Sequence, residues 1–495
     1  MTEKGLPLTG ASKASQQWES IDWAQVVRQV KQLQMRIAKA VREERWGKVK
    51  SLQWLLTHSF SAKLLAVKRV TQNQGAKTAG VDNILWLTAE QKWNAANQLD
   101  RRGYKPSPLR RIYIPKSNGK QRPLGIPTML DRAQQALYLL TLEPISETVA
   151  DPNSYGFRPK RSAADATGQC FNALAHRHSS TWILEADIRA CFDKINHQWM
   201  LNNLPIDKKM LNLWLKSGYI DKQVFHWTKE GTPQGGIISP TLMLMTLQGL
   251  ETAIRQAAKP TDKVNVVIYA DDFIVTGATK EVLVDTIKPV VIDFLANRGL
   301  ELSKEKTFIT HIHQGFNFLG FNIRKYQQKL LIKPAKGNVL NFLKRVRALI
   351  KSQPCTKPDD LIRLLNPKIR GWSNYYRHVV SKKAFSYVDY QIFQSVWQWC
   401  LRRHPQKCKR WVKRKYFRAD EHSQWIFNGK SVDNEGTRLL DLFKASSIPI
   451  CRHVKIVAKA TPYDPAYIKY FQHRYFKARR GVLATGYYFH NLPSF

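Results

Sequence analysis

The amino-acid sequence predicts an α+β fold, with an antiparallel sheet in the middle of the chain and helices after it. Two pairs of strand-like runs each flank a turn signal, first at Asn118-Gly119 and then at Asp271-Asp272. From about residue 338 the apolar residues recur at helical spacing instead. Strands followed by helices are typical of α+β proteins.

Composition limits the function classes. The chain has 495 residues, which predicts more than one domain, and its formal charge is +42. Such a charge favours a polyanionic partner, above all nucleic acid. A membrane surface is the competing partner, but the basic residues are spread along the chain and interleaved with Trp and Tyr. No apolar run reaches the ~18 residues that a membrane span needs.

Cysteines and the N-terminus predict the compartment. The six cysteines show no C-x-x-C spacing, which argues against a zinc ribbon or a disulfide framework and fits a reducing cytosol. The first residues lack the apolar stretch of a signal peptide. We therefore expect the protein to stay where it is made.

The first element is an amphipathic basic helix. Its apolar positions recur every three or four residues, and Lys and Arg occupy the other faces. An ordinary solvated face is the alternative, but basic residues continue through Lys48, Lys63 and Arg69. Contact with a nucleic-acid backbone is therefore the favoured interpretation. The apolar positions are Val26, Val30, Leu33, Ile37 and Val41.

Strands come next. A hairpin is expected around Asn118-Gly119, then a helix from Asp131, and then a strand from Thr181 to Ile188 that carries Asp187 near its end. The run VNVVIYADDFIVTG predicts a second hairpin with Asp271 and Asp272 at its turn. Further strands are expected at KTFITHI, FNFLGFNI and KLLIKP.

The paired acids at this turn predict a metal site. Adjacent carboxylates repel, and burial raises their pKa values unless a cation compensates them. A solvated Asp-Asp turn is the alternative. Nucleotidyl transfer needs two Mg²⁺ ions about 4 Å apart, held by carboxylates from two chain segments. Asp187 and Asp271 supply these if their strands are neighbours, whereas Asp193 lies beyond the turn and is expected to be structural.

The last third is basic and helical. The segment from Pro334 to Asn338 is the best boundary between the sheet part and the helical part. Further along, the run LRRHPQKCKRWVKRKYFR contains nine Lys or Arg among eighteen residues.

Seven motifs in order give a family resemblance. These are PKSNGKQRPLGIPT, SYGFRPKRSA, the segment from Asp187 to Asp193, GTPQGGIISP, YADD, RGWSNYYR and RHVKI. Together they resemble the bacterial group II intron-encoded proteins, which are reverse transcriptases that also act as splicing maturases. The likeness covers about residues 25 to 475.

The resemblance implies a right-hand polymerase. It implies an N-terminal extension over residues 1–70, fingers and palm over 71–335, an α-helical thumb over 336–404 and a basic DNA-binding domain over 405–495. Two Mg²⁺ ions would be held by Asp187, Asp271 and Asp272. The implied partners are intron RNA in a ribonucleoprotein, target DNA and a primer-template duplex, in a bacterial cytoplasm without membrane contact.

The resemblance also suggests residues that bind the dNTP. Lys116 and Arg122 flank the first hairpin turn and match cations that grip the triphosphate, although they could be solvated hairpin charges. Phe192 matches the aromatic residue that excludes a ribose 2′-hydroxyl, although such a Phe is often a core residue. Gln234 lies beside two glycines that permit close approach of the nucleotide, with a plain glycine turn as the alternative.

Other residues are candidates for nucleic-acid contact. Arg158 and Arg161 are expected at template phosphates, but Arg158 can equally pin a loop. Lys306 matches a region where related polymerases place a cationic general acid, and a simple lysine at a strand edge is favoured over that role. For Trp372 core packing is the simpler interpretation, although the family places this region against RNA. The remaining candidates are Arg370, Arg410, Lys413 and Arg414.

Relatives often end in a histidine-asparagine-histidine nuclease with zinc-binding cysteines, which this sequence is not expected to contain. Its primers would then come from nascent strands or from a separate nuclease. Two alternatives remain open. One is a stand-alone reverse transcriptase of the retron, diversity-generating or CRISPR-associated kind, and the other is an RNA-binding splicing factor with a vestigial polymerase site.

Overall fold

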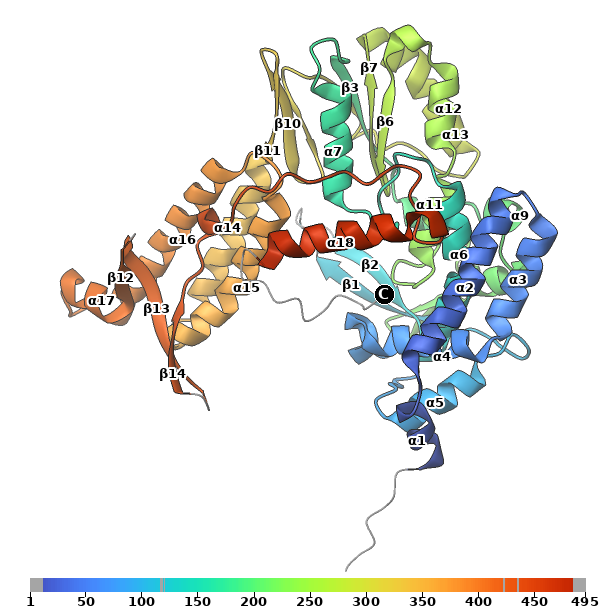
Figure 1. Cartoon of the computed structure of the whole chain (residues 1–495), viewed down its shortest axis with the longest axis horizontal. Coiled ribbons are helices and arrows are strands. Elements are labelled where there is room, and N and C mark those ends of the chain that lie inside the picture. Colours follow the sequence, from blue (N-terminus) through green and yellow to red (C-terminus); the bar gives the residue numbers. More distant parts are fainter. Residues whose placement is uncertain (1–11, 116–118, 120, 422, 434–435, 484–495) are drawn as a thin grey trace, which may run out of the picture. The chain divides into compact units, whose positions relative to one another are not determined.

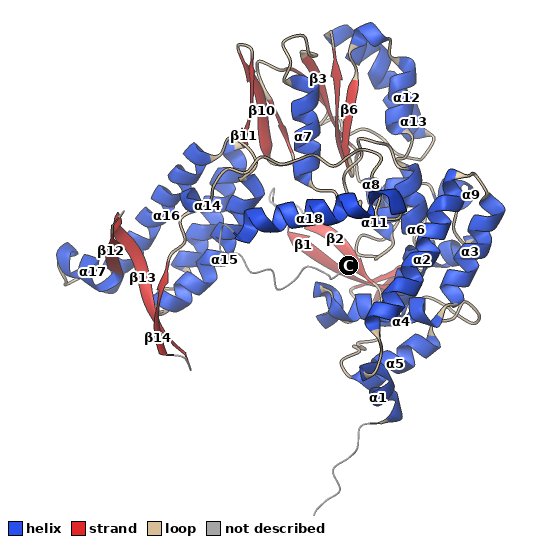
Figure 2. Ribbon diagram, in the orientation of Figure 1, coloured by secondary structure: helices blue, strands red, loops and turns tan. Residues whose placement is uncertain are grey.

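The computed structural model describes residues 12–115, 119, 121–421, 423–433 and 436–483. The chain divides into two compact units. The first unit comprises Met1–Ala166, Ile183–Ile309 and Ile456–Phe471, and the second comprises Thr167–Trp182, Thr310–Lys455 and Gln472–Phe495. The elements of both are shown in Figures 1 and 2.

The first unit begins with helices. In the basic helix α2, Val26, Val30 and Ile37 are buried while Arg36 and Lys39 are exposed, which confirms the predicted amphipathic pattern. Asp22 caps this helix by accepting hydrogen bonds from the N–H groups of the first turn. The N-terminal elements are α1 (Lys13–Glu19), α2 (Trp23–Arg42), α3 (Trp46–His58), α4 (Phe60–Gln72), η1 (Gln74–Lys77) and α5 (Ala89–Gln98).

Helix α6 (Met129–Val149) is the central helix of the first unit and is buried along most of its length. It packs against α2, α3, α4 and α11 (Ser239–Thr246). Its start two residues before Asp131 agrees with the predicted helix, and Thr128 caps it by accepting from the N–H of Asp131.

A four-stranded sheet, the β1 sheet, has the order β2-β1-β4-β5. Strands β1 (Leu109–Pro115) and β2 (Gln121–Ile126) are antiparallel, with Pro115 opposite Gln121, which confirms the predicted strands on both sides of the first turn. Strand β4 (Tyr219–Asp221) runs parallel to β1, and β5 (Val224–His226) is antiparallel to β4.

A second four-stranded sheet, the β6 sheet, has the order β6-β7-β3-β8. Its strands are β3 (Trp182–Asp187), β6 (Asn265–Tyr269), β7 (Asp272–Gly277) and β8 (Phe308–His311). Helix α12 (Leu250–Ala257) packs on β6, and η3 (Val282–Ile287) packs on β7 and continues into α13 (Lys288–Ala296). Figure 1 shows α12 and α13 together beside β6.

Shorter elements complete the first unit. Its other elements, including two that continue into the second unit (α7 and α18), are α7 (Ala163–Leu174), α8 (Cys191–Lys194), α9 (His197–Asn203), α10 (Lys208–Leu215), η2 (Pro260–Asp262), η5 (Pro465–Tyr467) and α18 (Ile468–Leu483).

The second unit carries a three-stranded sheet, β11-β10-β9, followed by three long helices. Its strands confirm the runs expected at FNFLGFNI and KLLIKP, and its helices begin close to the predicted boundary. The elements are β9 (Phe316–Phe318), β10 (Phe321–Tyr326), β11 (Lys329–Pro334), α14 (Lys336–Lys351), α15 (Pro358–Tyr376) and α16 (Lys382–Arg403).

A second small sheet follows, which the sequence reasoning did not anticipate. Strands β12 (Phe417–Asp420), β13 (Ser423–Asp433) and β14 (Gly436–Asp441) form an antiparallel sheet that packs on α15. Helix α17 (Lys409–Tyr416) packs on the same sheet, and η4 (Ala445–Ser447) packs on α16. Within the described part of the chain no helix is long and apolar enough to cross a membrane.

Candidate nucleotidyl-transfer site

The β6–β7 hairpin has a two-residue turn. Tyr269 lies opposite Asp272, so Ala270 and Asp271 form the loop between the strands. Ala270 has a φ of 59°, and tight hairpins of this length require a positive φ at the first loop residue. This geometry confirms the predicted hairpin and places Asp271 in its turn, whereas Asp272, also expected at the turn, is the first residue of β7.

Gly156 lets a neighbouring segment approach this turn closely, a role that the sequence reasoning missed. The N–H of Tyr155 donates to the carbonyl of Ile268 (2.9 Å), and the N–H of Ile268 donates to the carbonyl of Asn153 (2.9 Å). A Cβ on Gly156 would lie 2.3 Å from the backbone nitrogen of Ala270. The glycine in SYGFRPKRSA was the available signal, since close backbone contact requires glycine.

Asp187 lies beside the hairpin because β3 is the neighbour of β7. The N–H of Ile188 donates to the backbone carbonyl of Asp271 at 3.1 Å. The prediction that the two acid-bearing strands are neighbours is therefore confirmed.

The three aspartates lie in each other's electrostatic field. Burial is the main cause that raises the pKa of Asp271, and the charge of Asp187 adds to it. Burial, followed by the charges of Asp187 and Asp271, raises the pKa of Asp272 to about 7. A cation at this place would relieve the repulsion.

Lys306 supplies one such cation. Its Nζ donates to both carboxylate oxygens of Asp187, at 3.0 Å each. The Asp187 side chain is 23% exposed and that of Lys306 is 64% exposed. Lys306 is thus more than the simple strand-edge lysine favoured from the sequence, since it is the ion-pair partner of a candidate metal ligand.

The donor set fits Mg²⁺ chemically. Carboxylate oxygens are the hard ligands that Mg²⁺ prefers, and a cation here would offset the mutual repulsion of these carboxylates. Among the described residues, however, no three His, Cys, Asp or Glu side chains are gathered as a metal site. The Asp187 carboxylate faces the lysine ammonium instead.

Gln234 and Arg122 lie near these acids. The Gln234 side chain donates to Asp193 at 3.1 Å, and its backbone carbonyl accepts from the N–H of Gly125 in β2 (2.7 Å). Asp193 thus holds Gln234, which agrees with its predicted structural role. Arg122 is exposed in β2, and its charge offsets a part of the burial-driven rise in the pKa of Asp271.

Phe192 and Lys116 complete the predicted dNTP set. Phe192 is half-buried in α8, and its ring meets Phe157 edge to face with centroids 6.1 Å apart. Lys116 lies outside the described residues. Of the four predicted residues, Arg122 acts electrostatically on Asp271, while Gln234 is bonded to Asp193.

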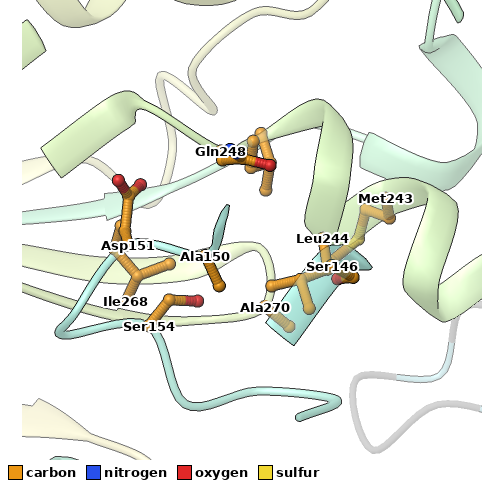
Figure 3. Close-up of a pocket in the computed structure, with 10 residues that line it drawn as sticks. Ser146, Ala150, Asp151, Ser154, Met243, Leu244, Gln248, Ile268 and Ala270 are labelled. Carbon is orange, nitrogen blue, oxygen red and sulfur yellow. The ribbon is translucent and has the colours of Figure 1, made fainter. Parts of the chain in front are cut away.

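A small cavity lies behind the hairpin (Figure 3). Its volume is about 10 Å³, and Ser146, Ser154 and Ala270 are among its lining residues. Ligand pockets usually measure about 300–1,000 Å³, so this cavity is a packing feature and holds no nucleotide.

Comparison with known families agrees with this geometry. Residues 18–99 match the N-terminal domain of reverse transcriptase, residues 114–323 match the reverse transcriptase (RNA-dependent DNA polymerase) family, and residues 339–417 match the group II intron, maturase-specific domain. All three candidate aspartates fall inside the second match.

Curated relatives extend the comparison. Protein YkfC of Escherichia coli is 32% identical, over 52% of this chain and 80% of YkfC. The group II intron-encoded protein LtrA of Lactococcus lactis subsp. cremoris is 29% identical, over 70% of this chain and 73% of LtrA. The chain belongs to the group II intron-encoded proteins. It is an RNA-directed DNA polymerase that also binds intron RNA as a maturase, in intron splicing and mobility.

A solved telomerase structure from Candida albicans covers 65% of the intron-encoded protein and 63% of the telomerase chain, with 12% identity and a TM-score of 0.36. With a TM-score this low, the telomerase structure does not serve as support for the fold.

The two arginines of SYGFRPKRSA are engaged inside the intron-encoded protein. Arg158 pairs with Glu147 at 2.7 Å, and its side chain is 2% exposed. It also donates to the carbonyls of Asp151 and Ser154 (3.0 Å each). This corrects the expectation of a phosphate contact and supports the alternative in which Arg158 pins a loop.

Arg161 is half-buried and donates to the carbonyl of Ala458 at 2.7 Å. Burial is the first cause that lowers its pKa, to about 10, and the charge of Arg158 adds to it. It thus ties the segment after residue 456 to the first unit.

The candidates in RGWSNYYR lie in the helical part of the second unit. Trp372 stacks on Phe342 with centroids 4.8 Å apart and planes 11° apart, and it also contacts Phe385. It therefore packs between α14, α15 and α16, as the simpler interpretation held. Arg370 lies over the ring of Phe443 at 4.7 Å.

Helix α17 of the intron-encoded protein presents a basic face. Val412 and Tyr416 are buried, while Arg410 and Arg414 are exposed. Lys413 lies over the Trp425 ring at 4.5 Å. The exposed arginines are available to a polyanion.

Proposed function

We propose that Asp187, Asp271 and Asp272 hold two Mg²⁺ ions and form the polymerase site of this intron-encoded protein. The main support is the hydrogen bond from the N–H of Ile188 to the carbonyl of Asp271, because it joins the segments that bear these acids. When bound, the ions lower the pKa of the primer 3′-hydroxyl and neutralise charge on the triphosphate. The hydroxyl attacks the α-phosphate in line, and pyrophosphate leaves.

The dNTP is proposed to lie between this site and the β1 sheet. Arg122 and Lys116 would bind the triphosphate, since arginine suits bidentate contact with phosphate oxygens. Gln234 would contact the base or template, and its present bond to Asp193 holds the side chain in place. Phe192 would exclude a ribose 2′-hydroxyl.

Helices α14 to α16 are proposed as the thumb, and the part from residue 405 as the basic domain that meets target DNA. Arg370, Arg410, Lys413 and Arg414 would contact nucleic acid, because exposed or π-stacked cations can neutralise phosphates. Arg161 could add a template contact only if its bond to Ala458 opened. The domain boundaries at residues 70, 335 and 404 and a location in a bacterial cytoplasm are part of this proposal.

A paired assay tests the proposal. The Asp271→Asn variant should lose primer extension on an RNA template yet promote intron splicing at the wild-type rate, because splicing chemistry belongs to the RNA. If Asp271→Asn extended primers normally, the assigned site would be wrong. If the wild type promoted splicing but extended no primer, the vestigial alternative would hold.

A further inference from the structure

The Lys306–Asp187 ion pair suggests a role that goes beyond a phosphate contact. The Lys306 ammonium donates to both oxygens of the Asp187 carboxylate, at 3.0 Å each. A hard divalent cation uses these same oxygens as ligands. A cation that binds Asp187 must therefore displace or share the place of the ammonium.

The backbone holds Lys306 at this position. The N–H of Ser303 donates to the carbonyl of Asp187 (2.8 Å), and the N–H of Lys306 donates to the carbonyl of Ser303 (3.2 Å). Two residues after Asp187, just beyond the end of β3, the N–H of Arg189 donates to the carbonyl of Glu301 (2.9 Å). The segment that carries the lysine is thus bonded directly to the segment that carries the aspartate.

Lys306, and not the nearby Arg189, forms the ion pair with Asp187. Arg189 is also close in sequence, but its side chain pairs with Glu301 at 2.8 Å. The Lys306 side chain is 64% exposed, so it can swing into solvent without breaking core packing. A partly exposed ion pair of this kind is weak enough to be exchanged.

We propose that Lys306 is a displaceable counter-ion which weakens divalent-metal binding to Asp187 in the protein without substrate. The inference rests on the proposed role of Asp187 as a metal ligand. A phosphate oxygen of primer, template or dNTP gives the released ammonium a new partner. Metal and polyanion therefore bind cooperatively, and each raises the affinity of the other by the same factor.

Mn²⁺ binding to the full chain tests this without activity. Free Mn²⁺ is measured by electron paramagnetic resonance, with neither nucleotide nor nucleic acid present. Lys306→Met should raise the affinity for Mn²⁺ about threefold to tenfold. This range is expected when a partly exposed ion pair is lost and the ammonium no longer repels the metal. Lys304→Met removes an exposed lysine two residues away and should change the affinity less than twofold.

Two further variants make the result decisive. In an Asp187→Asn background, Lys306→Met should tighten Mn²⁺ binding by a smaller factor than in the wild type, since only the ammonium's repulsion of the metal is left to remove. Lys306→Arg keeps a cation that can bind both carboxylate oxygens of Asp187, so it should bind Mn²⁺ no more tightly than the wild type does. Lys306→Arg also gives a test if Lys306→Met folds poorly. If Lys306→Arg bound Mn²⁺ about threefold to tenfold more tightly than the wild type, the inference would be overturned.

The outcomes separate this inference from the proposed function. If Asp187→Asn binds Mn²⁺ as well as the wild type does, Asp187 is no metal ligand and the proposed site fails. If Asp187→Asn weakens binding but Lys306→Met has no larger effect than Lys304→Met, the site stands and the counter-ion role is wrong.

Discussion

At the residue scale, the position of the acidic turn depends on a glycine that carries no chemistry. Gly156 lies against the backbone of Ala270, and the adjoining Tyr155 and Asn153 are hydrogen-bonded to β6. The β6–β7 hairpin is therefore supported from outside its own two strands.

We expect Gly156→Ala to displace the turn. The added methyl group would lie 2.3 Å from a backbone nitrogen, so the chain must move, at a cost of about 1–3 kcal/mol. Primer extension should fall while RNA affinity is kept. Gly47→Ala is the control, because no heavy atom lies within 4 Å of its Cβ position in α3. Equal effects of the two substitutions on extension would contradict the supporting role.

Arg158 offers a second residue-scale prediction. Arg158→Met leaves the Glu147 carboxylate buried without its partner, which typically costs about 3–5 kcal/mol. The melting temperature of this variant should be lower than that of the wild type. Combining Arg158→Met with Glu147→Leu should restore a part of the loss. Below the melting transition, the salt dependence of RNA affinity should be that of the wild type. A slope reduced by about one would instead indicate a phosphate contact.

At the element scale, α12 is capped by a buried acid. Asp151 Oδ2 accepts from the N–H groups of Gly249 (3.0 Å) and Glu251 (3.3 Å). Burial nevertheless raises the pKa of Asp151 to about 6. The folded protein thus binds this proton more tightly than the unfolded chain does.

This cap predicts a pH dependence of stability. Because the raised pKa belongs to the folded state, the free energy of unfolding falls as pH rises from about 4 to about 7. Asp151→Asn can keep an accepting oxygen but does not titrate. Relative to the wild type, it should therefore gain roughly 2 kcal/mol of stability between pH 4.5 and pH 7.5. A stability difference that is the same at both pH values would refute the shift.

Helix α17 predicts an electrostatic effect. Arg410→Gln combined with Arg414→Gln should weaken nucleic-acid binding and lower the slope of log affinity against log salt by about two. The matched control, Arg410→Lys with Arg414→Lys, keeps both charges and should keep the slope. If the glutamine pair leaves the slope unchanged, the basic face of α17 does not meet phosphates.

At the scale of the whole molecule, turn residues and apolar spacing in the sequence predicted the elements that depend on short-range interactions. The two hairpins and the basic helix α2 followed from turn residues and apolar spacing. The β12–β14 sheet was not predicted, because the apolar run Trp425-Ile426-Phe427 is too short to mark a strand by its periodicity.

Contacts between residues far apart in the chain could not be predicted from the sequence. Lys306 meets Asp187 across 119 positions of the chain, and nothing local marks that pair. The Arg158–Glu147 pair is closer in sequence, but whether an arginine faces solvent or a buried carboxylate depends on packing. Family motifs located these residues, and only the fold distinguished a buried arginine from a phosphate-binding one.

Asp187, Asp271 and Asp272 are proposed to form a metal-dependent polymerase site. The most direct test is Mg²⁺-dependent extension of a DNA primer on an RNA template by the wild type and Asp271→Ala. We predict extension that requires Mg²⁺ and a loss of roughly a thousandfold or more in the variant, since losing a metal ligand removes several kcal/mol of stabilisation. Wild-type extension without divalent metal, or equal rates for both proteins, would contradict the account.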